Sequence, residues 1–209
     1  MLPNDASNSW RERWREGRTA WDQGGHSAAM EQLLYHSQRE GGLQVGAKIF
    51  SAGCGRAHNE AWLAQHGFLV AAVDVADEAI AAANQLYAAH TGLSLAVQDI
   101  FTLDTSHYSF DAIFDRAMLC ALAPGQRAAY LSQLTALLRP GGIIMAILFR
   151  SVRTPDGPPF AVDESEAFSL LGADFDLCFA CTSPKAIDSS QVLDEWMCIW
   201  RKRALQESN

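Results

Sequence analysis

The sequence has no apolar run approaching the roughly 20 residues that a helix needs to cross a bilayer. Its most hydrophobic stretch, Ile143 to Phe149, has the length of a buried strand. The first residues lack a basic segment followed by an apolar one, so we expect no signal peptide. The five cysteines are an odd number at irregular spacing, which favours reduced thiols over a disulfide framework. From these absences we expect a soluble protein of the cytoplasm.

Charged residues are also few, at 19% of the chain, whereas hydrophobic residues make up 49%. Such a chain of 209 residues can bury a sizeable core without disulfides or metals. The net charge of -8 repels phosphate backbones and anionic lipids, so we expect neither nucleic acid nor a membrane as a partner. One basic cluster is interleaved with acidic residues, so we interpret it as a solvated helix face; its members are Arg11, Arg13, Arg15 and Arg18.

No internal repeat, low-complexity segment or long linker divides the chain, so residues 1–209 are expected to form one domain. The N-terminal part reads as helical. Trp10 and Trp14 are four positions apart, which places both rings on one helical face. Gly17 interrupts this helix, and a second helix is predicted from Ser27 to Arg39.

Between residues 46 and 203, apolar strands alternate with helices. Strands are predicted at residues 48–52, 69–75, 93–97, 111–115 and 143–149, and helices at residues 57–65, 77–89 and 126–138, the second with Asp77 as its N-cap. Almost uniformly apolar strands separated by helices indicate a parallel sheet covered on both faces. Phe175–Thr182 and Val192–Trp200 follow each other too closely for a parallel crossover, so we expect an antiparallel hairpin. The fold class is therefore α/β, a mostly parallel seven-stranded sheet with a C-terminal antiparallel hairpin, as in Rossmann-like methyltransferases.

The first predicted strand runs into a glycine-rich turn, Ser51 to Gly55, and then directly into a helix. Glycines at this place let the backbone turn tightly and approach a ligand without a Cβ in the way. The dinucleotide fingerprint needs a third glycine at position 58, where His58 stands. A pyrophosphate cradle, and with it a nicotinamide-dependent oxidoreductase, is therefore disfavoured. A ligand without phosphates is still allowed, and so is a purely structural turn.

Acidic residues end the second and third predicted strands. Asp74 lies about 20 residues after the glycine turn, where a carboxylate can accept both hydroxyls of a ribose. Asp99 can reach an adenine amino group while Ile100 covers the face of the ring. Either acid can instead cap a helix or a turn. Together with the glycine turn, these residues predict a nucleoside pocket at the carboxyl edge of the sheet.

Several motifs spread over nearly the whole chain are similar to those of the thiopurine S-methyltransferase family, in particular its bacterial members. They are Trp10-x-x-x-Trp14-x-x-Gly17-x-Thr19-Ala20-Trp21, Gln23-Gly24-Gly25-His26, Cys54-Gly55-Arg56-Ala57 with Trp62-Leu63-Ala64, Phe114-Asp115-Arg116-Ala117, Ala121-x-x-Pro124-Gly125-x-Arg127-x-x-Tyr130, and Gly157-Pro158-Pro159-Phe160-x-Val162. The tryptophan segment and the Asp-Arg segment are specific to this family, whereas the glycine turn is shared by class I S-adenosylmethionine-dependent methyltransferases in general.

The resemblance implies S-adenosyl-L-methionine as cofactor, S-adenosyl-L-homocysteine as its product, and a small-molecule acceptor. Residues 1–40 would form a helical lid over a Rossmann-like core of residues 46–203. The residue roles that it implies are Trp10, Trp14 and Trp21 over the cofactor, Gly53 at its methionine part, Asp74 at the ribose, Asp99 and Ile100 at the adenine, Arg116 between cofactor and acceptor, and Trp21, Arg116, Pro159 and Phe160 around the acceptor. We expect a monomer with a role in detoxification.

The expected chemistry is methyl transfer to sulfur. The cofactor is already activated, so the protein mainly aligns the reactants and excludes water. A thiol of lowered pKa is largely thiolate at neutral pH, so we expect no general base among the catalytic residues. Arg116 is the candidate for stabilising an anionic acceptor, although an ion pair with Asp115 or another carboxylate is the alternative. For Trp10 and Trp14 the alternative is a helix stapled to the core.

The natural acceptor stays open. Ala52 stands in the glycine turn where the family usually has proline, and residues 184–191 contain one lysine and no arginine, whereas mammalian members carry a second basic residue near the acceptor. The alternatives are methylation of selenium or tellurium oxyanions or of halide, and a non-catalytic nucleoside-binding protein. His58-x-Glu60 with Cys178-x-x-Cys181 superficially resembles a zinc deaminase signature, but the cysteines lie in a predicted strand and we expect no metal.

Overall fold

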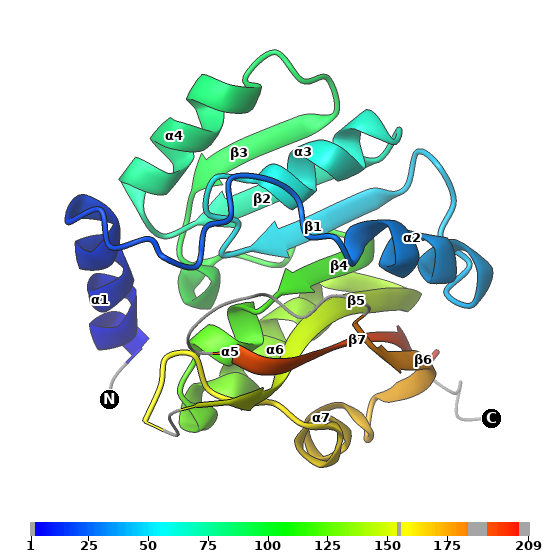
Figure 1. The fold of residues 1–209 in the computed structure, drawn as a ribbon. Helices are drawn as coiled ribbons and strands as arrows, with labels where there is room; N and C mark the ends of the chain where they lie inside the picture. The colour runs from blue at the N-terminus through cyan, green and yellow to red at the C-terminus, as the bar shows by residue number, and fades with distance from the viewer. Residues whose placement is uncertain (1–2, 154–155, 184–191, 205–209) are drawn as a thin grey trace.

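The computed structural model describes residues 3–153, 156–183 and 192–204, and within these ranges seven strands form one sheet (Figure 1). The spatial order is β3-β2-β1-β4-β5-β7-β6. The strands are β1 (Lys48–Ala52), β2 (Leu69–Asp74), β3 (Leu93–Val97), β4 (Phe110–Arg116), β5 (Leu138–Val152), β6 (Phe175–Thr182) and β7 (Val192–Lys202). β1 to β5 pair in parallel, whereas β7 is antiparallel to both β5 and β6. The predicted fold class and the predicted C-terminal hairpin are confirmed.

The helices connect these strands. They are α1 (Pro3–Arg15), α2 (Met30–Arg39), α3 (His58–Gln65), α4 (Asp77–Tyr87), α5 (Met118–Ala121), α6 (Pro124–Leu137) and α7 (Glu164–Leu171), with a 3-10 turn η1 (Ile100–Thr102) after β3. In Figure 1, α1 stands beside the carboxyl ends of the parallel strands, and it contacts the start of α4. Among the described residues, no helix combines the length and the apolar character that crossing a membrane requires.

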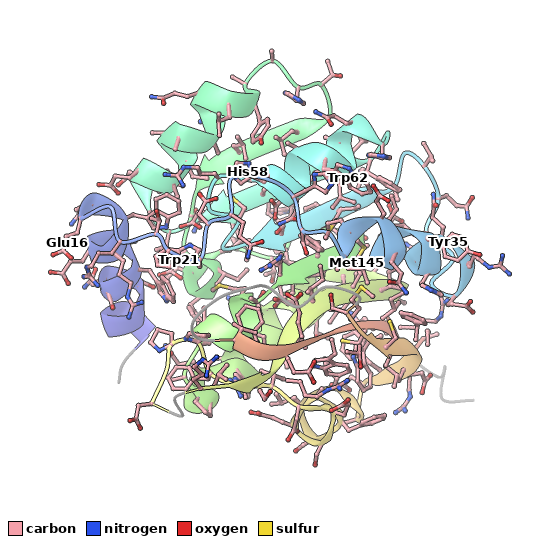
Figure 2. The ribbon with its side chains drawn as sticks, viewed as in Figure 1. Glu16, Trp21, Tyr35, His58, Trp62 and Met145 are labelled. Atoms are coloured by element: carbon pink, nitrogen blue, oxygen red, sulfur yellow. The ribbon has the colours of Figure 1, made fainter. Side chains whose placement is uncertain are left out.

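Alternate residues of the central strands belong to two apolar clusters, one on each face of the sheet. Ile144 and Leu148 of β5 belong to a cluster that also contains residues of α5, α6 and α7. Their neighbours Met145 and Ile147 belong to a cluster with residues of α2 and α3 (Figure 2). Burial on both faces is why the parallel strands are apolar at nearly every position, since helices cover each side.

The boundaries differ from the predictions in a few places. The helix predicted from Ser27 begins at Met30, because Ser27 lies in the turn before it. Asp77 is the first residue of α4 and does not cap it; the N-cap residue is Ala76, whose amide donates to Asp74. β5 begins at Leu138, five residues before the predicted start at Ile143. α5 and α7 were not predicted, and residues 184–191, with their single lysine, lie outside the described part of the chain.

Candidate functional site

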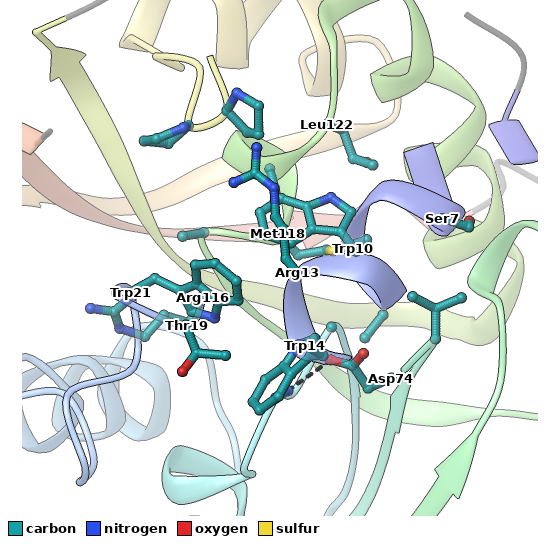
Figure 3. A pocket seen from close by; sticks show the side chains of 18 of the residues that line it. Ser7, Trp10, Arg13, Trp14, Thr19, Trp21, Asp74, Arg116, Met118 and Leu122 are labelled. Carbon is teal, nitrogen blue, oxygen red and sulfur yellow. Dashed lines mark hydrogen bonds between the residues drawn. The ribbon is translucent and has the colours of Figure 1, made fainter. Parts of the chain in front are cut away.

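A cavity of about 1130 Å³ lies at the carboxyl edge of the sheet, between the ends of the parallel strands and α1 (Figure 3). Its floor includes residues that follow β1, β2, β3 and β4. β1 lies between β2 and β4, because the chain passes from β1 through β2 to β3 on one side and continues with β4 on the other. In open α/β sheets this reversal leaves a crevice at the strand ends, which is where ligands bind.

The glycine turn forms one wall of this cavity. Gly53 has φ +68° and Gly55 has φ +56°, conformations that side chains with a Cβ rarely adopt. A Cβ on Gly53 would lie 2.6 Å from Sδ of Met118. Both glycines line the cavity, so the turn brings the backbone into direct contact with its contents.

Asp74 ends β2 and is 7% exposed. Its Oδ2 accepts a hydrogen bond from the Gly55 amide at 2.9 Å, and its Oδ1 accepts one from the Ala76 amide at 2.9 Å. Burial raises the pKa of this carboxyl, and the backbone amides work against that shift. Each carboxylate oxygen can accept a second hydrogen bond, and Asp74 lines the cavity. The carboxylate is thus fixed in place by backbone amides and has acceptor capacity left on the side of the cavity.

Asp99 and Ile100 lie at the end of β3. Asp99 caps η1 by accepting from the Phe101 amide at 3.0 Å, so the turn-capping alternative is realised. Its other oxygen accepts from the Ser7 hydroxyl of α1 at 2.7 Å. Ile100 is 4% exposed and lines the cavity beside Asp99. The acid therefore also anchors α1 over the end of β3.

The three tryptophans predicted for the lid meet around the same cavity. The ring of Trp21 makes edge contacts with Trp10, at 5.1 Å between centroids, and with Trp14, at 6.1 Å. Trp14 is 8% exposed and packs with Ala76 and Ala79 at the start of α4. The alternative of a helix stapled to the core is therefore realised, because Trp14 holds α1 to the core, and all three rings also line the cavity.

Arg116 ends β4 and enters the cavity from the sheet (Figure 3). Its Nη2 lies 3.5 Å from Oε1 of Glu195 on β7. The alternative ion pair with Asp115 does not form, because that carboxylate accepts from the Tyr130 hydroxyl at 2.9 Å and from the Met118 amide at 2.9 Å. Burial raises the pKa of Asp115 to about 6 and lowers the pKa of Arg116. Arg116 thus presents a desolvated cation, held by one long ion pair, to whatever occupies the cavity.

Only part of the loop after β5 lines the cavity. Pro158 and Pro159 line the cavity. Phe160 does not; a Cβ on Gly157 would meet its ring, and its amide donates to the Cys120 carbonyl at 2.7 Å. The structure therefore brings Pro159 to the cavity, whereas Phe160 supports the loop.

Some lining residues were not predicted. Arg13, interpreted as part of a solvated face, lines the cavity with its guanidinium 4.9 Å from the Trp10 ring centroid. Its position three residues after Trp10 is the helical spacing that could have found it. Ser7 and Met118 also line the cavity, but only the tertiary fold places them there. No group of three or more His, Cys, Asp or Glu placed to hold a metal occurs among the described residues.

Comparisons with known proteins give matches over most of the chain. The model of the family described as thiopurine S-methyltransferase matches residues 5–184. A thiopurine S-methyltransferase of Nitrosomonas eutropha is 32% identical over 178 residues, covering 75% of this chain and 77% of that protein. A thiocyanate methyltransferase 1 of Arabidopsis thaliana is 30% identical over 165 residues, covering 78% of this chain and 70% of that protein.

Solved structures share the fold. The 1,6-didemethyltoxoflavin-N1-methyltransferase of Burkholderia thailandensis, with its substrate and S-adenosylhomocysteine bound, superposes with a TM-score of 0.73. It is 23% identical, and the match covers 97% of this chain and 91% of that one. The N-methyltransferase NodS of Bradyrhizobium japonicum, also with S-adenosylhomocysteine, superposes with a TM-score of 0.69 at 20% identity, covering 83% of this chain and 85% of that one.

Proposed function

The chain belongs to the thiopurine S-methyltransferase family and is an S-adenosylmethionine-dependent S-methyltransferase, and on this premise we propose that it methylates the sulfur of a small-molecule thiol or thiopurine-like acceptor. The observation that carries the proposal is the meeting of Asp74, the glycine turn, the lid tryptophans and Arg116 around one cavity. The family sets the class of reaction, and the cavity sets where it takes place.

The residues fit the cofactor. Asp74 presents a fixed carboxylate to the cavity for the ribose hydroxyls, and Gly53 carries no side chain at the turn that lines the cavity. Ile100 offers an apolar surface for the adenine beside the acid Asp99. The faces of Trp10 and Trp21 suit a sulfonium cation, which aromatic rings attract. When bound, the cofactor supplies an activated methyl group.

The rest of the cavity suits an acceptor. Pockets of about 300–1,000 Å³ hold one drug-sized ligand, so about 1130 Å³ leaves room for a second molecule beside the cofactor. Arg116 and Arg13 supply positive charge, and Trp21 and Pro159 supply apolar surface. We propose Phe160 as a support for this side of the site, through its contact with Gly157.

The protein's part in the reaction is alignment, charge and the exclusion of water. Arg116 donates charge-assisted hydrogen bonds to a thiolate and so favours the ionised acceptor. The lid tryptophans cover the reactants and keep water from them. We assign no general base, because a thiolate is nucleophilic without one.

The whole chain acts as one domain, with residues 1–40 as lid over residues 46–203, as a monomer in the cytoplasm.

Incubation with methyl-labelled S-adenosylmethionine and a panel of acceptors tests the proposal. Aromatic and heterocyclic thiols should be methylated in preference to thiocyanate, iodide, selenite and tellurite. Thiocyanate belongs in the panel because a plant relative is named for it. Preference for iodide or the metalloid oxyanions would replace the thiol assignment, and transfer to no acceptor would favour a binding protein without turnover.

A further inference from the structure

A second cavity, of about 100 Å³, adjoins the larger one at the glycine turn. The two share Trp14, Trp21, Gly53 and Arg116 among their lining residues. The smaller cavity has the volume of about three water molecules, at about 30 Å³ each. That volume suits the charged end of an amino acid.

Glu60 of α3 lines this cavity with a half-satisfied carboxylate. The residue is 2% exposed, and its Oε1 accepts a hydrogen bond from the Ser51 hydroxyl at 2.7 Å. Its Oε2 is buried and has no hydrogen-bond partner within the described part of the chain. An unpaired buried carboxylate oxygen is costly, and the adjoining cavity has room for a donor that would satisfy it.

The other acid in this cavity is already occupied. Asp22 accepts from the Gly24 amide at 2.8 Å, forms an ion pair with Arg56, and lies 3.2 Å from Nε2 of His58. Arg116, which also lines the cavity, has its 3.5 Å ion pair with Glu195. Glu60 is therefore the acid that faces the cavity with acceptor capacity free.

We propose that Glu60 binds the ammonium group of the amino-acid end of S-adenosylmethionine and holds that end in the smaller cavity. The ammonium supplies both the hydrogen-bond donor and the positive charge that the buried carboxylate lacks. The inference rests on the cofactor placement proposed above and is independent of which acceptor receives the methyl group. Glu60 is a positioning residue in this role, because it fixes the direction of the cofactor and touches no reacting atom.

Binding of two ligands tests this role. S-adenosylhomocysteine carries the amino-acid end, and 5′-methylthioadenosine lacks it. Glu60→Gln should weaken S-adenosylhomocysteine binding by about tenfold or more, the magnitude of a charge-assisted hydrogen bond, and leave 5′-methylthioadenosine binding unchanged. Glu31→Gln, an exposed acid of α2, is the charge-matched control and should change neither. Equal losses for both ligands, or no loss for either, would overturn the proposal.

A second measurement needs no variant. The groups that act electrostatically on Glu60, or on which it acts, are Arg116, Asp74, Tyr87 and Cys54. Burial raises the pKa of Glu60 to about 7. The ratio of the two affinities should therefore rise in favour of S-adenosylhomocysteine as the pH is raised through about 7, since an ionised carboxylate binds an ammonium. Asp74 contacts only the part common to both ligands, so its titration cancels, and a flat ratio would count against the proposal.

The outcome is separable from that of the proposed function. A protein that discriminates the two ligands through Glu60 but methylates no thiol keeps this inference and loses the acceptor assignment. A protein that methylates thiols while Glu60→Gln leaves the ratio unchanged keeps the function and loses the inference.

Discussion

The carboxylate of Asp74 accepts a 2.9 Å hydrogen bond from the amide of Gly55, and this contact joins the end of β2 to the turn after β1. The two residues are 19 positions apart in the sequence and line the same cavity. One acid thus fixes the shape of the glycine turn and faces the place proposed for the ribose. With the ribose placed as proposed, cofactor affinity and the local backbone are coupled at this site.

Replacement of Arg116 should act on the acceptor. Arg116→Gln removes the desolvated cation, so the thiolate form is less stabilised and kcat/KM should fall by about 10- to 100-fold, the range of one charge-assisted hydrogen bond. The pH dependence of kcat should move to higher pH, because the bound acceptor then has a higher pKa. Arg116→Lys should recover part of the rate.

The control for Arg116 is Arg139→Gln. Arg139 forms an exposed ion pair with Asp111 at 2.7 Å and is absent from the residues lining the larger cavity. Steady-state kinetics across pH with an aromatic thiol measures both effects. If the Arg116 variants kept the wild-type profile, the anionic acceptor would have to be stabilised by another group.

Trp21 should control how long the product stays bound. Trp21→Ala removes ring contacts with Trp10 and Trp14, each worth about 0.5–1.5 kcal/mol, so S-adenosylhomocysteine should dissociate about tenfold faster. Trp62→Ala is a matched control, because that ring stacks on His26 and is absent from the lining of the larger cavity. Stopped-flow dissociation measures both, and equal rates in the two variants would mean that Trp21 is not part of the lid.

Ionisation of Glu60 should lower the free energy of unfolding at neutral and higher pH. Burial raises its pKa from 4.5 to about 7 in the folded protein, so the folded state retains a proton that the unfolded state has released. Stability should then fall as the pH rises from about 4.5 to about 7, by an upper value of about 3 kcal/mol. Glu60→Gln removes this titration. The melting temperature of the variant relative to that of the wild type should therefore be higher at pH 8 than at pH 5. A variant less stable than the wild type at pH 8 would instead indicate a stabilising ion pair.

The sequence predicted the central strands β1 and β4 well because burial on both faces makes them apolar at most positions. It placed the start of β5 too late because Pro140, Gly141 and Gly142 read as helix-ending residues. They lie instead inside the strand, across an irregular pairing with β4. A Cβ on Gly142 would lie 2.9 Å from the Asp111 carbonyl oxygen, so close strand approach explains that glycine.

Two helices were missed for different reasons. α7 has a local signal, since Asp163 accepts from the Glu166 amide at 2.8 Å and an acid three residues after an N-cap residue is typical of helix starts. α5 has only four residues, and its first amides donate to Asp115 of the preceding strand. No pattern within so short a segment distinguishes it from a turn.

The site shows the same division. Asp74 and Asp99 could be predicted to line the cavity because strand ends of a parallel sheet meet at one edge, whereas Arg116 was predicted from the family resemblance. The Ser7–Asp99 contact joins residues 92 positions apart, so only the folded chain reveals it. In the sequence Glu60 stands out only as part of the signature that superficially resembles a zinc deaminase, whereas its burial and its hydrogen bond with Ser51 come from the folded chain.

The most direct measurement of the central claim is calorimetry of S-adenosylhomocysteine with Asp74→Ala, alongside Asp77→Asn as an exposed acid three residues away. With two hydrogen bonds to a charged acceptor removed, Asp74→Ala should lose about 100-fold in affinity or more, and 5′-methylthioadenosine should lose as much, because both ligands carry the ribose. Asp77→Asn should bind like the wild type, and a thermal melt of each variant reports its folding. An Asp74→Ala protein that is folded and binds S-adenosylhomocysteine with unchanged affinity would contradict the account, because the adenosine would then lie elsewhere.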